Sequence, residues 1–356
     1  MDTSVMITLG FLIFAIVMFA WEKIPLSITA MVVAVGLHLS GVLSAKEAFA
    51  GFVDPNVLLF MGMFVIGEAF FATGVAVGVG NVVHKFAKTE TSLLVAVMMI
   101  TGILSGFLSN TGTAAVLIPV IIGICKKSGF KQTKLLMPLV FAAAMGGNIS
   151  LIGAPGNMIA QAGLQQAGLG SFNFFDYGLV GLPILIVGTI FYATIGKRFL
   201  PDAPSHQPDG AFEGNDDYSH VPSWKKWTAA IVLILTVVAM IFEKQLGVKL
   251  YVSAWIGALV LVATNVISET AAVKSIDMKT IMLFAGSMAL GDAMVKTGTG
   301  SVIADIIVNS LGASPSPIVV LVVIFVLGVF MTNFMSNTAT CALLVPIGLS
   351  LASQLG

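Results

Sequence analysis

The sequence predicts an all-α polytopic membrane protein with two inverted-topology repeats, each containing a re-entrant helical hairpin and a broken helix. Three observations lead to this prediction. Of the 356 residues, 57% are hydrophobic and 10% are charged, whereas soluble domains are about 25% charged. Apolar segments of membrane-spanning length recur along the chain. One polar motif also occurs twice, each time at a break in an apolar segment.

Eight apolar segments are long enough to cross a bilayer, which takes roughly 17–25 residues. The first lacks the small-residue cleavage site of a signal peptide, so we interpret it as a retained helix. A polar stretch rich in Pro and Gly, residues 197–225, predicts a linker between two halves. The predicted spans are 4–21, 24–43, 56–80, 135–165, 174–196, 226–243, 250–267 and 280–300.

The basic residues predict the orientation of these spans. If the loop after 56–80 is cytoplasmic, 13 of the 17 basic residues lie inside, and only Lys46, Lys244, Lys249 and Lys296 lie outside. This distribution follows the positive-inside rule. We therefore expect the N-terminus outside and the 197–225 linker in the cytoplasm, in a membrane of the bacterial inner (plasma) type.

Residues 92–125 predict a re-entrant hairpin. They carry no charge, and lysines flank both ends, so both ends belong on the cytoplasmic side. Two full crossings would need about 40 residues, more than this segment has. A polar stretch, Ser109 to Thr113, interrupts it in the middle. Such a break is tolerated at membrane depth only where protein or a watery cavity satisfies the backbone. The alternative is two short helices with a polar kink.

The polar motif repeats at a fixed offset. Residues Ser109–Pro119 recur as Ser336–Pro346, 227 positions later, with seven of eleven residues identical. Seven positions within Phe60–Gly74 match positions within Phe284–Gly298 at an offset of 224. We therefore predict a first repeat over 1–196 and a second over 226–356, with its own hairpin over about 314–350.

The two repeats are predicted to face opposite ways. No charged residue follows Asp305, and an uncharged flank suits the outer side of a membrane. The second repeat also has no counterpart of the broken helix at 135–165, and we interpret this gap as a truncation. Inverted repeats with broken helices are typical of secondary transporters, which bind substrate where the repeats meet.

The hairpin tips carry groups that suit ions. Ser, Asn and Thr side chains donate and accept hydrogen bonds, and a helix N-terminus adds partial positive charge. Backbone carbonyls at a helix break can coordinate a cation. In the broken helix, Gly153-Ala154-Pro155-Gly156-Asn157 cannot continue an α-helix. Ordinary hydrogen bonding within a helix bundle, or a plain proline kink, would explain the same residues without a binding site.

These motifs resemble those of the divalent anion:sodium symporter family, within the ion-transporter superfamily that includes citrate transporters. The resemblance covers almost the whole chain. It implies a scaffold domain and a transport domain, a homodimer in the lipid bilayer, and elevator-type alternating access. It also implies Na⁺ as the coupling ion and a small anion as substrate: a dicarboxylate, a citrate-like anion or sulfate.

The resemblance implies site residues as well. One sodium site matches Ser105, Ser109, Asn110 and Gly153, and a second matches Thr332, Ser336 and Asn337. Substrate-binding positions match Asn110, Thr111, Ala154, Pro155, Gly156, Asn157, Asn337 and Thr338. Many dicarboxylate-type members have Thr where this chain has Ala154, so a preference for C4-dicarboxylates does not follow.

Other functions remain open or are disfavoured. Glu68 and Asp292 occupy equivalent positions in the repeats, and acids at such depth are candidates for function. Proton-coupled or exchange-type transport is therefore the main alternative, although a structural hydrogen bond would explain the two acids equally well. A passive anion channel is less favoured. The zero net charge predicts no nucleic-acid partner, and no hydrolase or nucleotide-binding motif predicts an enzyme.

Overall fold

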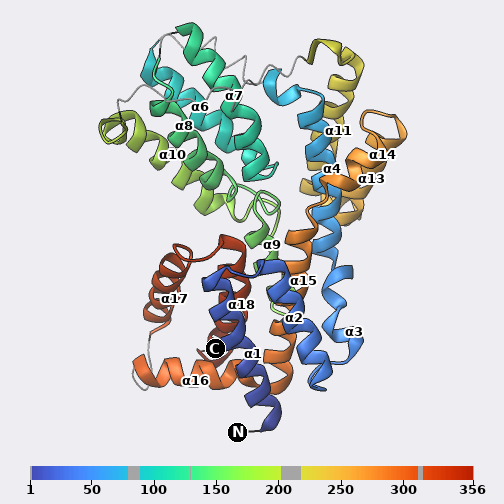
Figure 1. The fold of residues 1–356 in the computed structure, drawn as a ribbon, viewed down its shortest axis with the longest axis vertical. Coiled ribbons are helices and arrows are strands. Elements are labelled where there is room, and N and C mark those ends of the chain that lie inside the picture. Colours follow the sequence, from blue (N-terminus) through green and yellow to red (C-terminus); the bar gives the residue numbers. More distant parts are fainter. Residues whose placement is uncertain (1, 79–88, 129, 202–217, 312–315, 356) are drawn as a thin grey trace. The chain divides into compact units, whose positions relative to one another are not determined.

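The computed structural model describes residues 2–78, 89–128, 130–201, 218–311 and 316–355, and none of these residues forms a β-strand (Figure 1). The predicted all-helical fold is confirmed. The helices are α1 (Thr3–Trp21), α2 (Leu26–Leu39), α3 (Ala45–Ala48), η1 (Ala50–Val53), α4 (Pro55–Ala72), α6 (Glu90–Ser105), α7 (Asn110–Ser128), α8 (Thr133–Gly146), α9 (Pro155–Gln166), α10 (Gly178–Thr194), η2 (Gly196–Arg198), η3 (Tyr218–His220), α11 (Ser223–Ile241), α12 (Glu243–Leu246), α13 (Leu250–Ala263), α14 (Glu269–Ser275), α15 (Met278–Thr297), α16 (Thr299–Leu311), α17 (Pro317–Met331) and α18 (Asn337–Leu355).

The predicted apolar segments correspond to helices. Among the described residues, four helices are long and apolar enough to cross a membrane: α1, α4, α11 and α15. The broken helix predicted at 135–165 is also present, because α8 ends at Gly146 and α9 begins at Pro155. Parts of the predictions lie outside the described residues, namely Lys85 and Lys88, residues 79–80 and 314–315, and most of the 197–225 linker.

One predicted boundary differs. The span predicted at 280–300 ends at Thr297, and a separate helix, α16, begins at Thr299. Gly298 lies between them with φ of 75°, a left-handed conformation that glycine adopts without steric cost. Apolar residues of α16 pack with α17 and α18 around the buried Ala304, Val320 and Leu351.

The internal repeat extends to the helices themselves. α2 and α13 each have 14 residues, and their first residues are 224 positions apart. The same offset separates the starts of α3 and α14, and the hairpin helices α6–α7 and α17–α18 start 227 positions apart. The matched helices thus recur in the same order in both halves of the chain.

The helices fall into two compact units. Unit 1 comprises residues 1–58, 158–171 and 277–356, and unit 2 comprises residues 59–157 and 172–276. Each unit therefore combines segments from both predicted repeats, while the division at 1–196 and 226–356 stays a prediction about the sequence.

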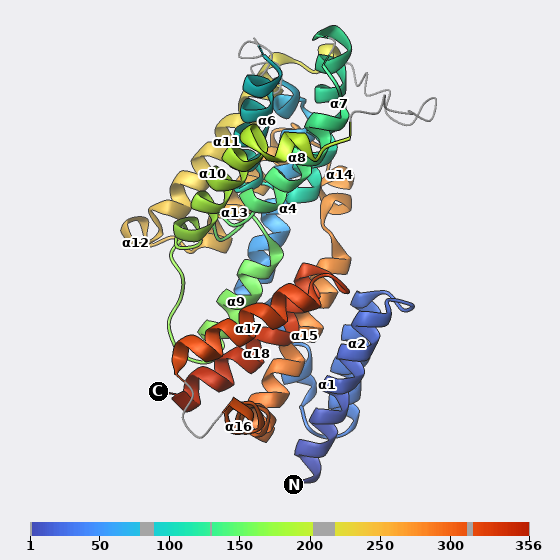
Figure 2. The ribbon, with the colours of Figure 1, turned by 90° about the vertical axis from the view of Figure 1, so that its left-hand side faces the viewer.

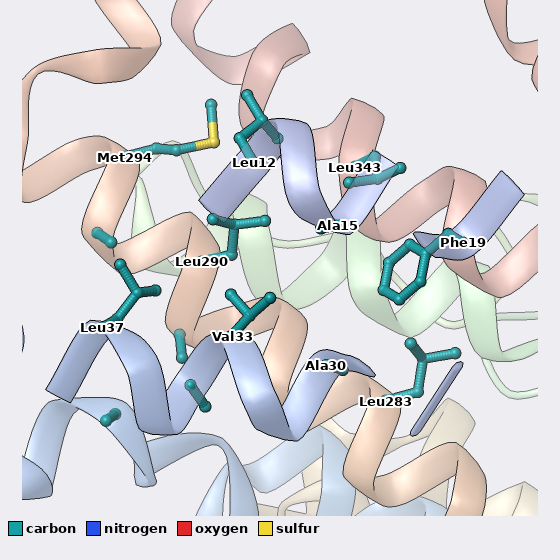
Figure 3. Close-up of a cluster of buried hydrophobic side chains, with 14 of the residues drawn as sticks. Leu12, Ala15, Phe19, Ala30, Val33, Leu37, Leu283, Leu290, Met294 and Leu343 are labelled. Carbon is teal, nitrogen blue, oxygen red and sulfur yellow. The ribbon is translucent and has the colours of Figure 1, made fainter. Parts of the chain in front are cut away.

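Unit 1 is organised around α15. Buried apolar residues of α1, α2, α15 and α18 form its core, as Figure 3 shows for Leu12, Phe19, Val33, Leu290 and Leu343. α17 and α18 lie side by side in this unit (Figure 2). Gly328 lies next to Leu344, and Gly348 next to Ile324, so the two helices form an antiparallel hairpin.

Unit 2 has a separate core. Buried residues of α6, α7, α8 and α10 pack together, including Leu93, Val97, Ile121, Leu139 and Leu185. The packing of α6 against α8 is very close, because a Cβ on Gly146 would fall on the backbone of Gly102. Two glycines at one crossing allow helix backbones to approach in this way.

A reciprocal contact links the two repeats. In unit 2, a Cβ on Gly62 of α4 would lie 2.7 Å from the Cβ of Ala254 on α13. In unit 1, a Cβ on Gly286 of α15 would fall on the backbone of Ala30 on α2. Gly62 and Gly286 are equivalent in the repeat, and so are Ala30 and Ala254. Each repeat therefore supplies the glycine of one contact and the alanine of the other.

Candidate functional site

The first hairpin turns at the predicted polar tip. α6 ends at Ser105 and α7 begins at Asn110. The Ser109 hydroxyl accepts a hydrogen bond from Gly112 N at 3.1 Å, and Ser109 O accepts one from Thr113 N at 2.9 Å. The Ser109 side chain therefore acts as the N-cap of α7.

Three of the four residues predicted for the first sodium site lie together. The Ser105 hydroxyl lies 2.7 Å from the carbonyl oxygen of Ala143. One terminal atom of the Asn110 amide lies 2.7 Å from Ser105 Oγ and 3.2 Å from the carbonyl oxygens of Ala143 and Gly153. An amide nitrogen at this position donates to these oxygens, whereas an amide oxygen there would add one more oxygen for a cation.

The broken helix is held in place by its own side chains. Asn157 is buried, and its Nδ2 donates to the carbonyl oxygens of Gly147, at 2.9 Å, and Ser150, at 3.0 Å. The Ser150 hydroxyl donates to the carbonyl of Gly106 in the hairpin tip. Tyr177 OH donates to Asn157 O at 2.9 Å. These bonds fix the loop between α8 and α9 against the first tip.

Glycine is required where the loop meets the tip. A Cβ on Gly153 would lie 2.6 Å from Gly147 O and 3.0 Å from Gly106 O. A Cβ on Gly147 would lie 2.5 Å from the Asn110 amide. Any larger residue at either position would push the carbonyls and the amide apart.

The second tip repeats the local geometry of the first. α17 ends at Met331 and α18 begins at Asn337. The Thr332 hydroxyl bonds to Asn337 Oδ1, as Ser105 does to Asn110. The Ser336 hydroxyl accepts a hydrogen bond from Ala339 N at 3.1 Å, as Ser109 does from Gly112. All three residues predicted for the second sodium site therefore lie at one tip.

The two tips differ in how they are covered. Ser105 is fully buried, whereas Thr332 and Asn337 are exposed. Leu94 and Met98 of α6 are 2% and 0% exposed, but the equivalent Leu321 and Phe325 of α17 are 67% and 70% exposed. α8 covers this face of α6. Among the described residues of unit 1, no helix covers the same face of α17.

The predicted substrate residues lie at the helix starts of the two units. Thr111 is exposed in the first turn of α7, and Thr338 is half-buried in the first turn of α18. Ala154, Pro155 and Gly156 are half-buried where α9 begins. The first tip belongs to unit 2 and the second tip to unit 1.

Sequence reasoning missed several parts of this site. The Ala143 carbonyl belongs to a residue whose side chain gives no polar signal. Ser150 lies three residues before Gly153, and this short spacing from the helix break is the signal that could have identified it. Tyr177 lies beyond the motif, and nothing in the sequence links it to Asn157.

Glu68 and Asp292 are both half-buried, in α4 and α15. The carboxyl of Asp292 interacts electrostatically with those of Glu47 and Asp54 in unit 1. Within the described part of the chain, no three His, Cys, Asp or Glu side chains gather as a metal site. Cys125 and Cys341 are free thiols.

Comparisons with known proteins give a consistent result. A family model described as "Citrate transporter" (CitMHS) matches residues 16–356. The "Uncharacterized transporter YfbS" of Escherichia coli is 33% identical over 211 residues, which are 59% of this chain and 35% of that protein. The "Sodium-dependent dicarboxylate transporter SdcS" of Staphylococcus saprophyticus is 25% identical over 365 residues, 92% of this chain and 69% of that protein.

A solved structure shares the fold. The crystal structure of the Alcanivorax borkumensis YdaH transporter, described as having an unusual topology, matches with a TM-score of 0.61. It is 16% identical in sequence, and the match covers 100% of this chain and 84% of that one. The chain thus spans about a third of YfbS, and most of SdcS and YdaH.

Proposed function

Because the chain belongs to the citrate transporter family, we propose that it carries a small anion across the membrane by sodium-coupled symport. The family and the apolar helices make it an integral membrane protein. The family and its relatives are transporters rather than enzymes. One relative is named as a sodium-dependent dicarboxylate transporter, which supports this class of ion and substrate. Citrate-like anions and sulfate belong to the same proposal.

The observation that carries the proposal is the oxygen cluster beside the first tip. Ser105 Oγ and the carbonyl oxygens of Ala143 and Gly153 all lie within 3.2 Å of one atom of the Asn110 amide. Oxygens at a helix break are the ligands that transporters offer to Na⁺. We assign Na⁺ to this cluster, with Asn110 Oδ1 turned toward the ion. Thr332 and Asn337 are the corresponding ligands at the second tip, next to the N-cap residue Ser336.

The start of α7 and the start of α18 each suit an anion. Each offers backbone N–H groups of a first helical turn, an Asn amide and a Thr hydroxyl, at Asn110 and Thr111 and at Asn337 and Thr338. Such helix starts attract anions. Arg198, the only arginine of the chain, lies in η2 after α10. Binding therefore depends on helix dipoles, amides, hydroxyls and the coupled cation.

The transport cycle belongs to the same proposal. Elevator-type alternating access by a homodimer, with separate scaffold and transport domains, follows from the resemblance of the tip motifs. The recurrence of equivalent helices supports an inverted repeat, since two halves related in this way can exchange inward and outward conformations.

Uptake by proteoliposomes tests the proposal. An imposed Na⁺ gradient should drive accumulation of labelled dicarboxylate or citrate. Asn110→Ala should reduce uptake tenfold to a hundredfold, since a lost bond to a charged group costs about 1.5–3 kcal/mol. Asn337→Ala should have a similar effect. Asn309→Ala, at an exposed position of α16, is the matched control and should transport normally.

Two results would contradict this proposal. Uptake that ignores the Na⁺ gradient would remove the sodium coupling. Near-normal uptake by the Asn110 variant, with Na⁺ dependence intact, would remove the assigned site.

Proton coupling is the second candidate, because Glu68 and Asp292 are half-buried acids at equivalent positions of α4 and α15. Acids at membrane depth are candidates for carrying a proton. Under this candidate, uptake follows a pH gradient rather than a Na⁺ gradient, and both Asp292→Asn and Glu68→Gln abolish the pH dependence. Uptake by these variants that still follows the pH gradient would exclude it.

A further inference from the structure

At one end of unit 2, α8 and α10 pack in antiparallel fashion. The rings of Phe141 and Tyr192 lie 5.9 Å apart. Toward the end of the pair, Thr133 Oγ1 donates to Pro201 O at 2.8 Å. The start of α8 therefore lies beside η2 and the residues that follow it.

Four basic residues gather at this end. Lys131 and Lys134 flank the start of α8, while Lys197 and Arg198 lie in η2. Lys197 Nζ also donates to Thr91 Oγ1 at 3.2 Å, which holds η2 against the start of α6. Arg198 is exposed. Its guanidinium forms paired hydrogen bonds to phosphate, which a lysine does not.

An apolar surface on α8 and α10 adjoins these basic residues. Exposed side chains of α8 and α10 lie along the same helix pair, and Phe199, directly after Arg198, is 79% exposed. The exposed apolar residues next to the basic end are Met137, Val140, Phe141, Phe191, Ile195 and Phe199. The surface is thus basic at one end and apolar along its length.

We propose that this surface binds an anionic phospholipid. The phosphate lies against Arg198 and Lys197 of η2, and the acyl chains lie along α8 and α10. Basic residues at the end of apolar membrane helices recognise lipid headgroups in this way. A free phosphate would use only the basic end and would leave the apolar strip without a role.

A second basic pair offers a control. Lys225 and Lys226 lie in the first turn of α11. Lys225 Nζ lies 5.6 Å from the centre of the Trp224 ring, and Lys226 Nζ donates to Tyr218 O at 2.8 Å. The pair carries the same charge as Lys197 and Arg198 and lies in the same unit, but not on the α8–α10 surface.

Thermal unfolding of the purified full chain in detergent tests the proposal. Added phosphatidylglycerol should raise the midpoint by about 3 °C or more, whereas phosphatidylcholine and inorganic phosphate should not. The double variant Lys197→Gln, Arg198→Gln should lose most of this shift, and Arg198→Lys should lose part of it. Lys225→Gln, Lys226→Gln should keep it.

Several outcomes would overturn the proposal. Equal shifts of the unfolding midpoint with both lipids would show that binding does not depend on the charge of the headgroup. An equal shift with inorganic phosphate would show a site for the phosphate ion alone. An equal loss in the α11 double variant would show a general interfacial effect. If the η2 double variant does not fold, the single variant Arg198→Gln with the same lipids gives the same decision.

Discussion

Asn110 and Asn157 use the same amide group for different purposes. Asn157 is buried, and its nitrogen donates to two backbone carbonyls, so its first role is to shape the broken helix. Asn110 faces a hydroxyl and two carbonyls, so its amide can serve either as a donor or as a cation ligand. Burial and hydrogen-bond partners, rather than residue type, therefore separate Asn157, which shapes the broken helix, from Asn110, which we propose as a cation ligand.

Gly146→Ala tests the close contact that positions the Ala143 carbonyl. The added Cβ would fall on the backbone of Gly102 and force α6 and α8 apart. We expect a loss of about 1–3 kcal/mol in the free energy of unfolding, together with reduced uptake. Gly123→Ala on α7 is the control, because no atom lies within 4 Å of its added Cβ. Equal stability of both variants, measured by denaturant unfolding in detergent, would refute the packing argument.

Among the elements, the short helix α3 is fixed by charge. Ser44 and Glu47 form a capping box at its start. Lys296 of α15 donates to both carboxylate oxygens of Glu47, at 2.9 and 2.8 Å. The bonds from Lys296 have the largest effect on the pKa of Glu47, and those from Ser44 the next largest. Together they hold this pKa at about 2, below its ordinary value of 4.5. This contact joins the chain between α2 and α4 to the end of α15.

This contact predicts a pH dependence of stability. Because the pKa is lowered in the folded protein, the contribution is complete above about pH 4.5 and is lost as the pH falls toward 2. In Lys296→Met the unfolding midpoint should fall less steeply between pH 5 and 3 than in the wild type. Lys249→Met removes a longer ion pair, 3.7 Å from Glu243, and is the control. An unchanged slope in Lys296→Met would contradict the prediction.

The sequence predicted elements better than it predicted contacts. Uncharged runs and the Ser-Asn-Thr breaks indicated the hairpins, because their signals are local. The partners of the tips were not local: Ala143 contributes only its backbone, and Tyr177 reaches Asn157 through a loop. α16 was missed because polar residues such as Asp305 and Asn309 interrupt its apolar sequence.

On the scale of the whole molecule, each repeat packs against the other through the same two equivalent positions. The glycine of one repeat contacts the alanine of the other in both units. The repeat also pairs the four described helices that are long and apolar enough to cross a membrane, α1 with α11 and α4 with α15. The exposed face of α17 is where the two halves differ most, because the equivalent face of α6 lies under α8.

Paired substitutions test these equivalent contacts. Gly62→Val and Gly286→Val should each lower the free energy of unfolding by about 1–3 kcal/mol, because both place side-chain atoms on a neighbouring helix. Gly10→Ala on α1 has open space around its added Cβ and should cost little. The stabilities of the three variants are compared with that of the wild type by thermal unfolding. A large effect at only one of the two equivalent glycines would contradict the equivalence.

The reciprocal glycine contacts also bear on how the chain is made. Ala30 of α2 packs against Gly286, and Gly62 of α4 packs against Ala254. Neither α2 nor α4 therefore has its close partner until much of the chain has been synthesised. Contacts so distant in sequence are entropically costly to form and slow folding. We therefore expect α2 and α4 to enter the bilayer as separate spans. Their glycine–alanine contacts with α15 and α13 form only late in translation.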